Sequence, residues 1–128
     1  MNKILIIEDE KETVNMLKGF LEARGYMVVA AFDGEEGLKK FDSEKPDLVI
    51  TDIRMPKKDG YQFLKELRPG RRWVPVIIVS GLNDLENILK SYDFEADFYI
   101  TKPINLEDML KAIKILLSLS PLRKTDNK

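Results

Sequence analysis

The chain has 128 residues, of which 44% are hydrophobic and 34% charged, and its formal net charge is -1. This length and composition predict one domain with a single buried core. The near-neutral charge gives no general attraction to nucleic acid or to an anionic membrane, so we expect neither as a direct partner. No apolar stretch approaches the roughly 20 residues of a membrane-spanning helix, and we expect a cytoplasmic protein.

Cysteine and histidine are both absent from the chain. Their absence excludes disulfides and thiolate chemistry, and it removes the commonest general base and the commonest metal ligand. Any reaction must therefore use carboxylates, hydroxyls, amines or guanidinium groups. Any bound metal should be a hard ion that prefers oxygen ligands, such as Mg²⁺.

Short apolar runs alternate along the chain with longer segments of helical period. This alternation is typical of repeated βαβ units, and it predicts an α/β fold with a parallel sheet. The first, third and fourth runs lack polar alternation, as expected of central strands that helices cover on both faces. The five predicted strands are residues 4–7, 27–31, 48–51, 76–79 and 98–100.

Five helices are predicted between and after these strands. The first carries an apolar stripe at Val14, Leu17 and Leu21 that stops near Gly25, which suits a helix end. The third should span about residues 61–67 and end before a Pro-Gly pair. Residues that resemble N-caps, each with an acid three positions later, mark the starts of the second, fourth and fifth helices: Asp33, Asn83 and Asn105.

The fifth helix is expected to end at Pro121, because proline interrupts helical hydrogen bonding. The polar residues that follow are expected to be disordered or to begin a linker. The predicted organisation is therefore one domain over residues 1–120 and a polar tail or linker start over residues 121–128.

Polar residues follow the C-terminal ends of four predicted strands, and these ends meet at one edge of a parallel sheet. Three carboxylates at that edge would repel one another and raise their pKa values unless a cation neutralised them, which predicts a Mg²⁺ site. The converging residues are Glu8, Asp9, Asp52, Ser80 and Lys102.

A carboxylate beside Mg²⁺ suits the acceptance of a phosphoryl group. Asp52 could act as the nucleophile and form an aspartyl phosphate. Ser80 could donate a hydrogen bond to a phosphoryl oxygen, and Lys102 could supply a compact positive charge. A cis bond before Pro103 would aim the lysine inward, but the sequence leaves the isomer open.

Four segments, residues 4–10, 52–60, 75–81 and 96–103, together resemble the receiver domain of two-component response regulators. The resemblance covers about residues 3–119. It implies a flavodoxin-like fold, in which one doubly wound parallel sheet of five strands, in the order 2-1-3-4-5, is flanked by five helices.

The resemblance also implies a role for each acid of the site. Asp52 would be the phosphoacceptor, Asp9 and Asp52 would bind Mg²⁺, and Glu8 would assist through water. The backbone carbonyl of Arg54 would complete the protein's share of the metal ligands.

The function implied is a signalling switch. Asp52 would take its phosphoryl group from a sensor histidine kinase or a phosphotransfer protein, with weak self-phosphorylation from small donors and weak autophosphatase activity. Ser80 and Lys102 would take part in phosphoryl transfer, and Ser80 and Tyr99 would be the switch residues that change conformation after it. The face made by the fourth helix, the fifth strand and the fifth helix would bind a downstream effector or a second copy.

Three alternatives remain open. A small Mg²⁺-dependent aspartyl-phosphate hydrolase often has a second acid two positions after its nucleophile, where this chain has Arg54. A flavodoxin-like cofactor module would need a phosphate-binding loop where residues 8–10 are all acidic. A degenerate receiver acting as a scaffold would not need the acceptor, acids, hydroxyl and lysine together.

Overall fold

The computed structural model of the chain describes residues 2–54, 60–81, 89–90 and 96–126. Five parallel strands form one sheet in the order β2-β1-β3-β4-β5. They are β1 (Lys3–Ile7), β2 (Met27–Ala31), β3 (Leu48–Asp52), β4 (Val76–Ser80) and β5 (Phe98–Thr101). The predicted sheet order is confirmed, and every observed strand matches its predicted range to within one residue at either end.

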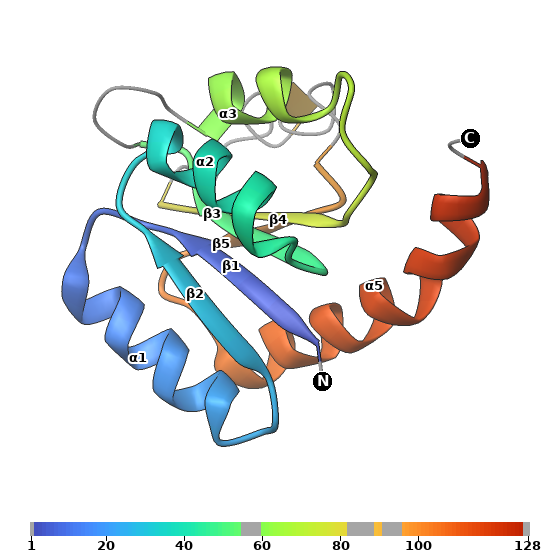
Figure 1. The fold of residues 1–128 in the computed structure, drawn as a ribbon. Coiled ribbons are helices and arrows are strands. Elements are labelled where there is room, and N and C mark those ends of the chain that lie inside the picture. The colour runs from blue at the N-terminus through green and yellow to red at the C-terminus, as the bar shows by residue number, and fades with distance from the viewer. Residues whose placement is uncertain (1, 55–59, 82–88, 91–95, 127–128) are drawn as a thin grey trace.

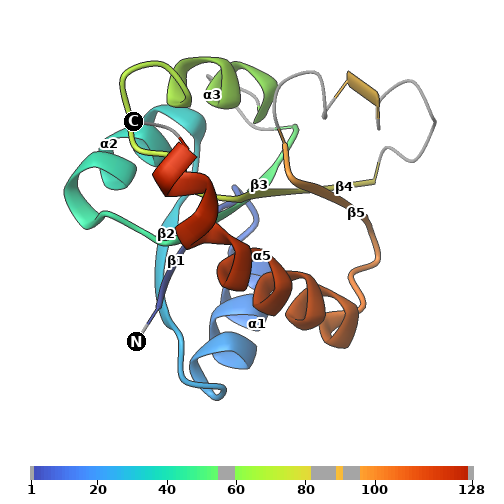
Figure 2. The ribbon, with the colours of Figure 1, turned by 90° about the vertical axis from the view of Figure 1, so that its right-hand side faces the viewer.

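Among the described residues there are four helices, two on each face of the sheet (Figures 1 and 2). One face is covered by α2 (Gly34–Glu44) and α3 (Gly60–Leu67), and the other by α1 (Lys11–Glu22) and α5 (Leu106–Asp126). The predicted fourth helix, with its cap at Asn83, falls almost entirely outside the described residues. None of the helices in the described part is both long and apolar enough to cross a membrane.

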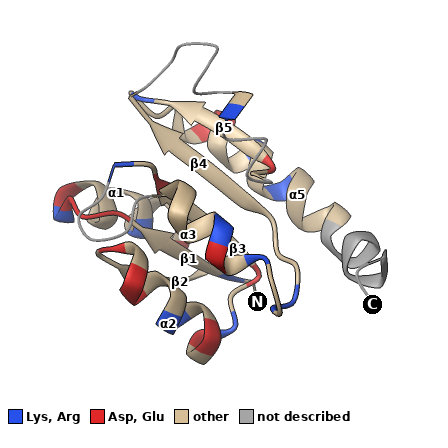
Figure 3. Ribbon diagram, turned by 90° about the horizontal axis from the view of Figure 1, so that it is seen from above, with Lys and Arg blue, Asp and Glu red and all other residues tan. Residues whose placement is uncertain are grey.

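The sheet separates two hydrophobic cores, because successive residues of a strand point to opposite faces. The core beneath α2 and α3 includes Phe41, Phe63, Leu64 and Leu67. The core beneath α1 and α5 includes Leu17, Leu21, Met109 and Ile113. Figure 3 shows the complementary pattern, with charged residues mainly on helices and loops while β4 carries none. Burial on both faces explains why the central strands lack polar alternation.

The helix ends follow the predicted signals where they are described. Gly25, with a φ of 91°, takes the left-handed conformation in the turn after α1. Asp33 Oδ1 accepts a hydrogen bond from the Glu36 backbone N–H at 2.8 Å, which caps α2. Asn105 Oδ1 accepts one from the Asp108 N–H at 3.0 Å, which caps α5. These caps confirm the predicted starts of both helices.

The predicted end of the last helix was wrong, because α5 continues through Pro121 to Asp126. A proline inside a helix removes one backbone hydrogen bond and can be accommodated by a bend. The ribbon of α5 changes direction in its C-terminal part (Figure 1).

Candidate active site

The pairing of β1 with β3 brings two acids together at the C-terminal edge of the sheet. Ile7 of β1 lies opposite Thr51 of β3. The residues that follow, Glu8 and Asp52, are therefore neighbours, and only 4% and 7% of their surfaces are exposed. Two buried carboxylates side by side are costly unless positive charge or hydrogen bonds compensate them.

The same register argument brings a hydroxyl and an amine from the next two strands. Asp52 lies opposite Val79, so Ser80 is one residue further along the edge. Ser80 lies opposite Thr101, and the backbone N–H of Lys102 donates to the Ser80 carbonyl at 2.8 Å. Residues from β3, β4 and β5 therefore converge through strand register alone.

Lys102 is the positive centre of the site. Its Nζ lies 2.7 Å from Asp52 Oδ2 and 3.3 Å from Glu8 Oε1. The Lys102–Pro103 peptide bond is cis. On the other side of the acid, the Arg54 backbone N–H donates to Asp52 Oδ1 at 3.2 Å. Both oxygens of Asp52 are thus held by donors, and the carboxylate has one orientation.

The local electrostatics shift the pKa of two groups. Burial, followed by the charge of Asp52, raises the pKa of Glu8 from 4.5 to about 7, although the Glu10 backbone N–H opposes the rise. For Lys102, burial alone would lower the pKa, but Asp52 and Glu8 together outweigh burial and raise it. The lysine therefore remains charged at neutral pH, whereas Glu8 is poised between its two protonation states.

A cavity of about 350 Å³ opens beside the acceptor candidate, lined by Asp52, Arg54, Ser80, Gly81 and Lys102. Ser80 is buried at its base, with 1% of its surface exposed. Arg54 and Gly81 are exposed, and a Cβ added at Gly81 would meet no atom within 4 Å. The cavity therefore leaves space beside Asp52 for an incoming group.

Two other predicted site residues take different places. Asp9 is exposed, next to the buried Glu8, and a hydrogen bond between their side chains contributes to the raised Glu8 pKa. Tyr99 is half-buried on β5 and packs against the core beneath α2 and α3. It does not line the cavity beside Asp52, so any role as a switch must act through packing.

The donor set has the chemistry that Mg²⁺ prefers, since Glu8, Asp9 and Asp52 provide carboxylate oxygens and Arg54 a backbone carbonyl. The raised pKa of Glu8 reflects buried negative charge that a cation would relieve. Within the described residues, however, no three acidic side chains are already gathered into a metal cage. The metal assignment therefore remains a prediction from the donor chemistry.

Sequence analysis missed the part played by Gly60, the first residue of α3. Its backbone N–H donates to the Ile53 carbonyl at 2.8 Å, and a Cβ there would lie 2.5 Å from the backbone oxygen of Asp52. Only glycine permits this approach of α3 to the end of β3. The Pro- and Gly-marked turn after Asp52 was a signal for it, but spacing alone does not show the contact.

The site lies where β1 and β3 adjoin, which is the point at which the strand order reverses. Ligand sites of open parallel α/β sheets form at this switch point, beyond the C-terminal ends of the strands. Fold and site together define a flavodoxin-like protein with an acidic site that also contains one lysine. A nucleotide-binding protein of this fold would instead have a loop at this place whose backbone N–H groups bind phosphate.

The model of the response regulator receiver domain family matches residues 4–114. The chain therefore belongs to that family, the receiver domains of two-component systems. Family membership decides against the aspartyl-phosphate hydrolase and the flavodoxin-like cofactor module. It does not by itself separate an active receiver from a degenerate one.

Curated relatives are transcriptional regulators. The chain is 36% identical over 120 residues to the alkaline phosphatase synthesis transcriptional regulatory protein PhoP of Bacillus subtilis, covering 94% of this chain and 50% of that protein. It is 36% identical to the transcriptional regulatory protein RprY of Bacteroides fragilis, covering 90% of this chain and 49% of that protein. The chain thus spans about half the length of these relatives.

Solved structures agree with the fold. A two-component response regulator from Clostridium difficile is 33% identical, with a TM-score of 0.88, and the match covers 92% of this chain and 97% of that one. The BeF3-activated N-terminal receiver domain of Klebsiella pneumoniae RstA is 30% identical, with a TM-score of 0.86, and the match covers 91% of this chain and 98% of that one.

Proposed function

We propose that this receiver domain is an active phosphorylation switch in which Asp52 accepts a phosphoryl group from a phosphohistidine. The observation that carries the proposal is the state of the Asp52 carboxylate, which is buried, held between Lys102 Nζ and the Arg54 N–H, and adjacent to an open cavity. These 128 residues contain no histidine, so the phosphohistidine lies outside them, and we take the donor to be a sensor histidine kinase or a phosphotransfer protein.

In the transfer, an Asp52 carboxylate oxygen attacks the phosphorus atom and a P–O bond forms. The P–N bond to the donor imidazole breaks, and the imidazole leaves with the bonding electrons and takes up a proton. Lys102, charged and 2.7 Å from the carboxylate, can stabilise the negative charge of the phosphoryl oxygens. Ser80, which lines the same cavity, can donate its hydroxyl hydrogen to one of them.

Receiver domains generally use Mg²⁺. In this chain the carboxylates of Glu8, Asp9 and Asp52 and the carbonyl of Arg54 would hold the ion. When bound, it would neutralise charge on the acids and on the transferring group. The chain's own contribution is to hold Asp52 in one orientation and to keep Lys102 charged beside it.

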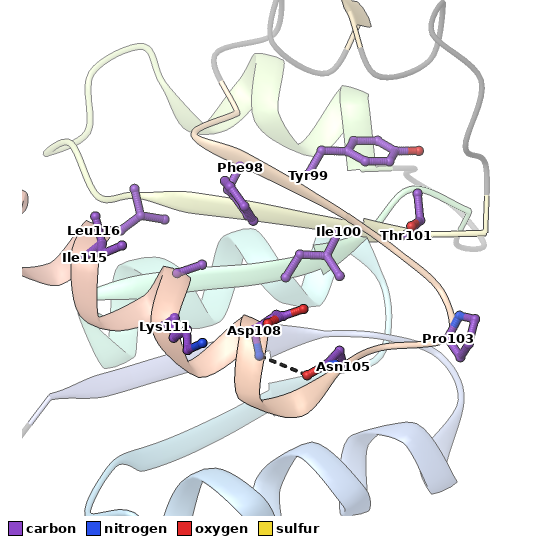
Figure 4. Close-up of a pocket in the computed structure, with 11 residues that line it drawn as sticks. Phe98, Tyr99, Ile100, Thr101, Pro103, Asn105, Asp108, Lys111, Ile115 and Leu116 are labelled. Atoms are coloured by element: carbon purple, nitrogen blue, oxygen red, sulfur yellow. Dashed lines mark hydrogen bonds between the residues drawn. The ribbon is translucent and has the colours of Figure 1, made fainter.

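The output surface of this proposal is a groove of about 550 Å³ between β5 and α5. In Figure 4, Phe98 and Ile100 point toward α5, while Tyr99 points to the opposite side of the strand. Phe98 and Ile115, which line the groove, are 41% and 59% exposed. Exposed apolar side chains grouped on one surface often mark a protein interaction site. We infer that a downstream effector or a second copy of the domain covers this surface.

Tyr99 connects the site's strand to that groove. The residue borders the groove, but its side chain points to the opposite side of β5 and packs on the core beneath α2 and α3. Movement of Ser80 toward a phosphoryl group would change the packing available to Tyr99, and the partner surface would change with it.

The experiment is phosphorylation by acetyl phosphate with Mg²⁺, followed by intact-mass measurement. We expect one acid-labile phosphate on the wild-type chain and none on Asp52→Asn. Lys102→Ala should retain Mg²⁺ binding, measured by titration, but accept phosphate slowly. An unmodified wild-type chain would support the degenerate scaffold instead, and an undiminished adduct on Asp52→Asn would move the acceptor elsewhere.

A further inference from the structure

A nearly buried ion pair joins two elements at the edge of the sheet opposite the site. Arg68 Nη2 lies 3.1 Å from Asp97 Oδ2, and both side chains are only 11% exposed. Arg68 Nη1 also donates to the Val74 carbonyl at 2.7 Å, and Asp97 Oδ2 accepts from the Val76 N–H at 2.8 Å. The pair is thus bound into the backbone at the start of β4.

Both partners of this pair are at the far ends of elements that begin or end at the site. Arg68 directly follows α3, whose first residue, Gly60, contacts the backbone of Asp52. Asp97 directly precedes β5, and Lys102 directly follows that strand. The pair therefore completes a frame of contacts. Arg68–Asp97 joins the end of α3 to the start of β5. At the other end, Gly60 of α3 contacts the end of β3, and Asp52 of β3 pairs with Lys102 after β5.

The strand in this frame is hydrogen-bonded to the sheet on one side only, and at its two ends the Asp97 N–H donates to the Val76 carbonyl at 2.9 Å and the Lys102 N–H to the Ser80 carbonyl at 2.8 Å. β5 has four residues and lies at the end of the sheet, paired with β4 alone. From Asp97 to Lys102 the chain extends about 16 Å, at about 3.3 Å per residue. If Asp97 shifted along β4, Lys102 would therefore shift with it, because an extended strand cannot stretch further to absorb the displacement.

We propose that Arg68 and Asp97 are positioning residues for the phosphoryl-transfer site: their ion pair sets the register of β5 on β4 and so holds Lys102 against Asp52. The inference rests on the proposed function of Asp52 for its effect on phosphorylation. The placement of Lys102 can be tested without any phosphorylation.

The chain contains a matched control close to this pair. Arg71 Nε lies 2.8 Å from Asp42 Oδ1, and Arg71 Nη2 donates to Asp42 Oδ2 at 3.1 Å. That pair has the same two residue types, but the Asp42 side chain is 56% exposed and the pair joins α2 to the turn after α3. Within the described residues, neither side chain of that pair forms a hydrogen bond with β5, so removing the pair should leave Lys102 in place.

The experiment compares Asp97→Asn with Asp42→Asn. Asparagine can still accept from the Val76 N–H, but it lacks the charge that holds Arg68. The first measurement is the rate at which an amine-reactive ester labels Lys102, read by peptide mass spectrometry, with Asp52→Asn as the reference for a released lysine. We expect Asp97→Asn to raise the labelling rate about tenfold, as for loss of a hydrogen bond to a charged group, and Asp42→Asn to leave it unchanged.

The second measurement is phosphorylation by acetyl phosphate. We expect Asp97→Asn to lower the maximal rate between about 10- and 100-fold, because small misplacements of catalytic groups are costly. The Mg²⁺ concentration for half-maximal rate should stay the same, since Lys102 is not a metal ligand. Far-UV circular dichroism checks folding, and Arg68→Gln, which can still donate to the Val74 carbonyl, replaces Asp97→Asn if that variant unfolds.

The proposal is overturned if Lys102 is labelled at the wild-type rate in the folded variant, even when phosphorylation slows. It is also overturned if Asp42→Asn releases Lys102 equally. Failure of the proposed function looks different, because a wild-type chain that takes no phosphate at Asp52 would still show Lys102 protected from labelling and released by Asp97→Asn.

Discussion

Replacing Glu8 by glutamine removes the titrating carboxyl of the site while keeping nearly the same shape. In the wild type this carboxyl is 4% exposed and has a pKa of about 7, raised from 4.5 by burial and by Asp52. Lys102 Nζ, 3.3 Å from Glu8 Oε1, partly opposes the shift, and we expect its 2.7 Å contact with Asp52 to persist in the variant. The substitution therefore isolates one protonation event in a buried position.

The direction in which stability changes with pH follows from proton linkage. The folded chain binds the Glu8 proton more tightly than the unfolded chain, so the contribution of this group to stability is complete below pH 4.5 and is lost as the pH rises through about 7. The difference between the two pKa values corresponds to at most about 3 kcal/mol in the free energy of unfolding. Relaxation around the charged carboxylate would reduce that figure.

The assay is urea unfolding with chelator present, from about pH 5 to about pH 8.5, with the free energy of unfolding taken by linear extrapolation. We expect Glu8→Gln to gain stability over the wild type as the pH rises, by about 1–3 kcal/mol at the alkaline end. The lowered pKa of Asp42, caused by its hydrogen bond with Arg71, favours the folded state above its ordinary pKa in both proteins and cancels. Parallel stability curves for the two proteins would refute the reasoning.

Two further pairs of substitutions test the local structure. Gly60→Ala should lower the free energy of unfolding by about 1–3 kcal/mol and slow the phosphorylation of Asp52. The alanine Cβ would lie 2.5 Å from the backbone oxygen of Asp52, which cannot move aside as a flexible side chain could. Gly19→Ala, where a Cβ meets nothing within 4 Å, should instead stabilise α1 by about 0.5–1 kcal/mol, and equal destabilisation by both would contradict the close-contact argument. Asp33→Ala should cost about 1 kcal/mol in thermal or urea unfolding, whereas Asp33→Asn should keep most of the α2 cap; equal losses from the two would show that the cap is not the cause.

The strands were predictable because their signals are local. Ile4, Leu5, Ile6 and Ile7 form an apolar run that is typical of a strand buried on both faces, and the structure buries all four. The caps at Asp33 and Asn105 were predictable for the same reason, since each hydrogen bond spans three residues.

Local signals failed at two helix ends. The expectation that Pro121 ends the last helix assumed that a proline outweighs its neighbours, but α5 continues to Asp126. At the end of α2, Lys45 takes a left-handed conformation with a φ of 50°, which composition gives no reason to expect of a lysine.

Within the candidate site, the sequence by itself determined which chemical groups are available and which strand ends carry them. An acid ends one apolar run, a serine another, and a lysine follows a third, and their convergence follows from a parallel sheet. The raised pKa of Glu8 followed only as a conditional expectation, because its size depends on how deeply Asp52 and Glu8 are buried together.

Only the tertiary structure decided how these groups are held. The contact of Lys102 with Asp52 joins residues 50 positions apart, and the pair of Arg68 with Asp97 joins residues 29 positions apart. No periodicity or spacing encodes such distances, because they depend on the register of strands and on how closely α3 approaches β3. The sequence thus determined the candidate site's chemical groups and the edge at which they meet, whereas three-dimensional packing determined their orientation and their electrostatic environment.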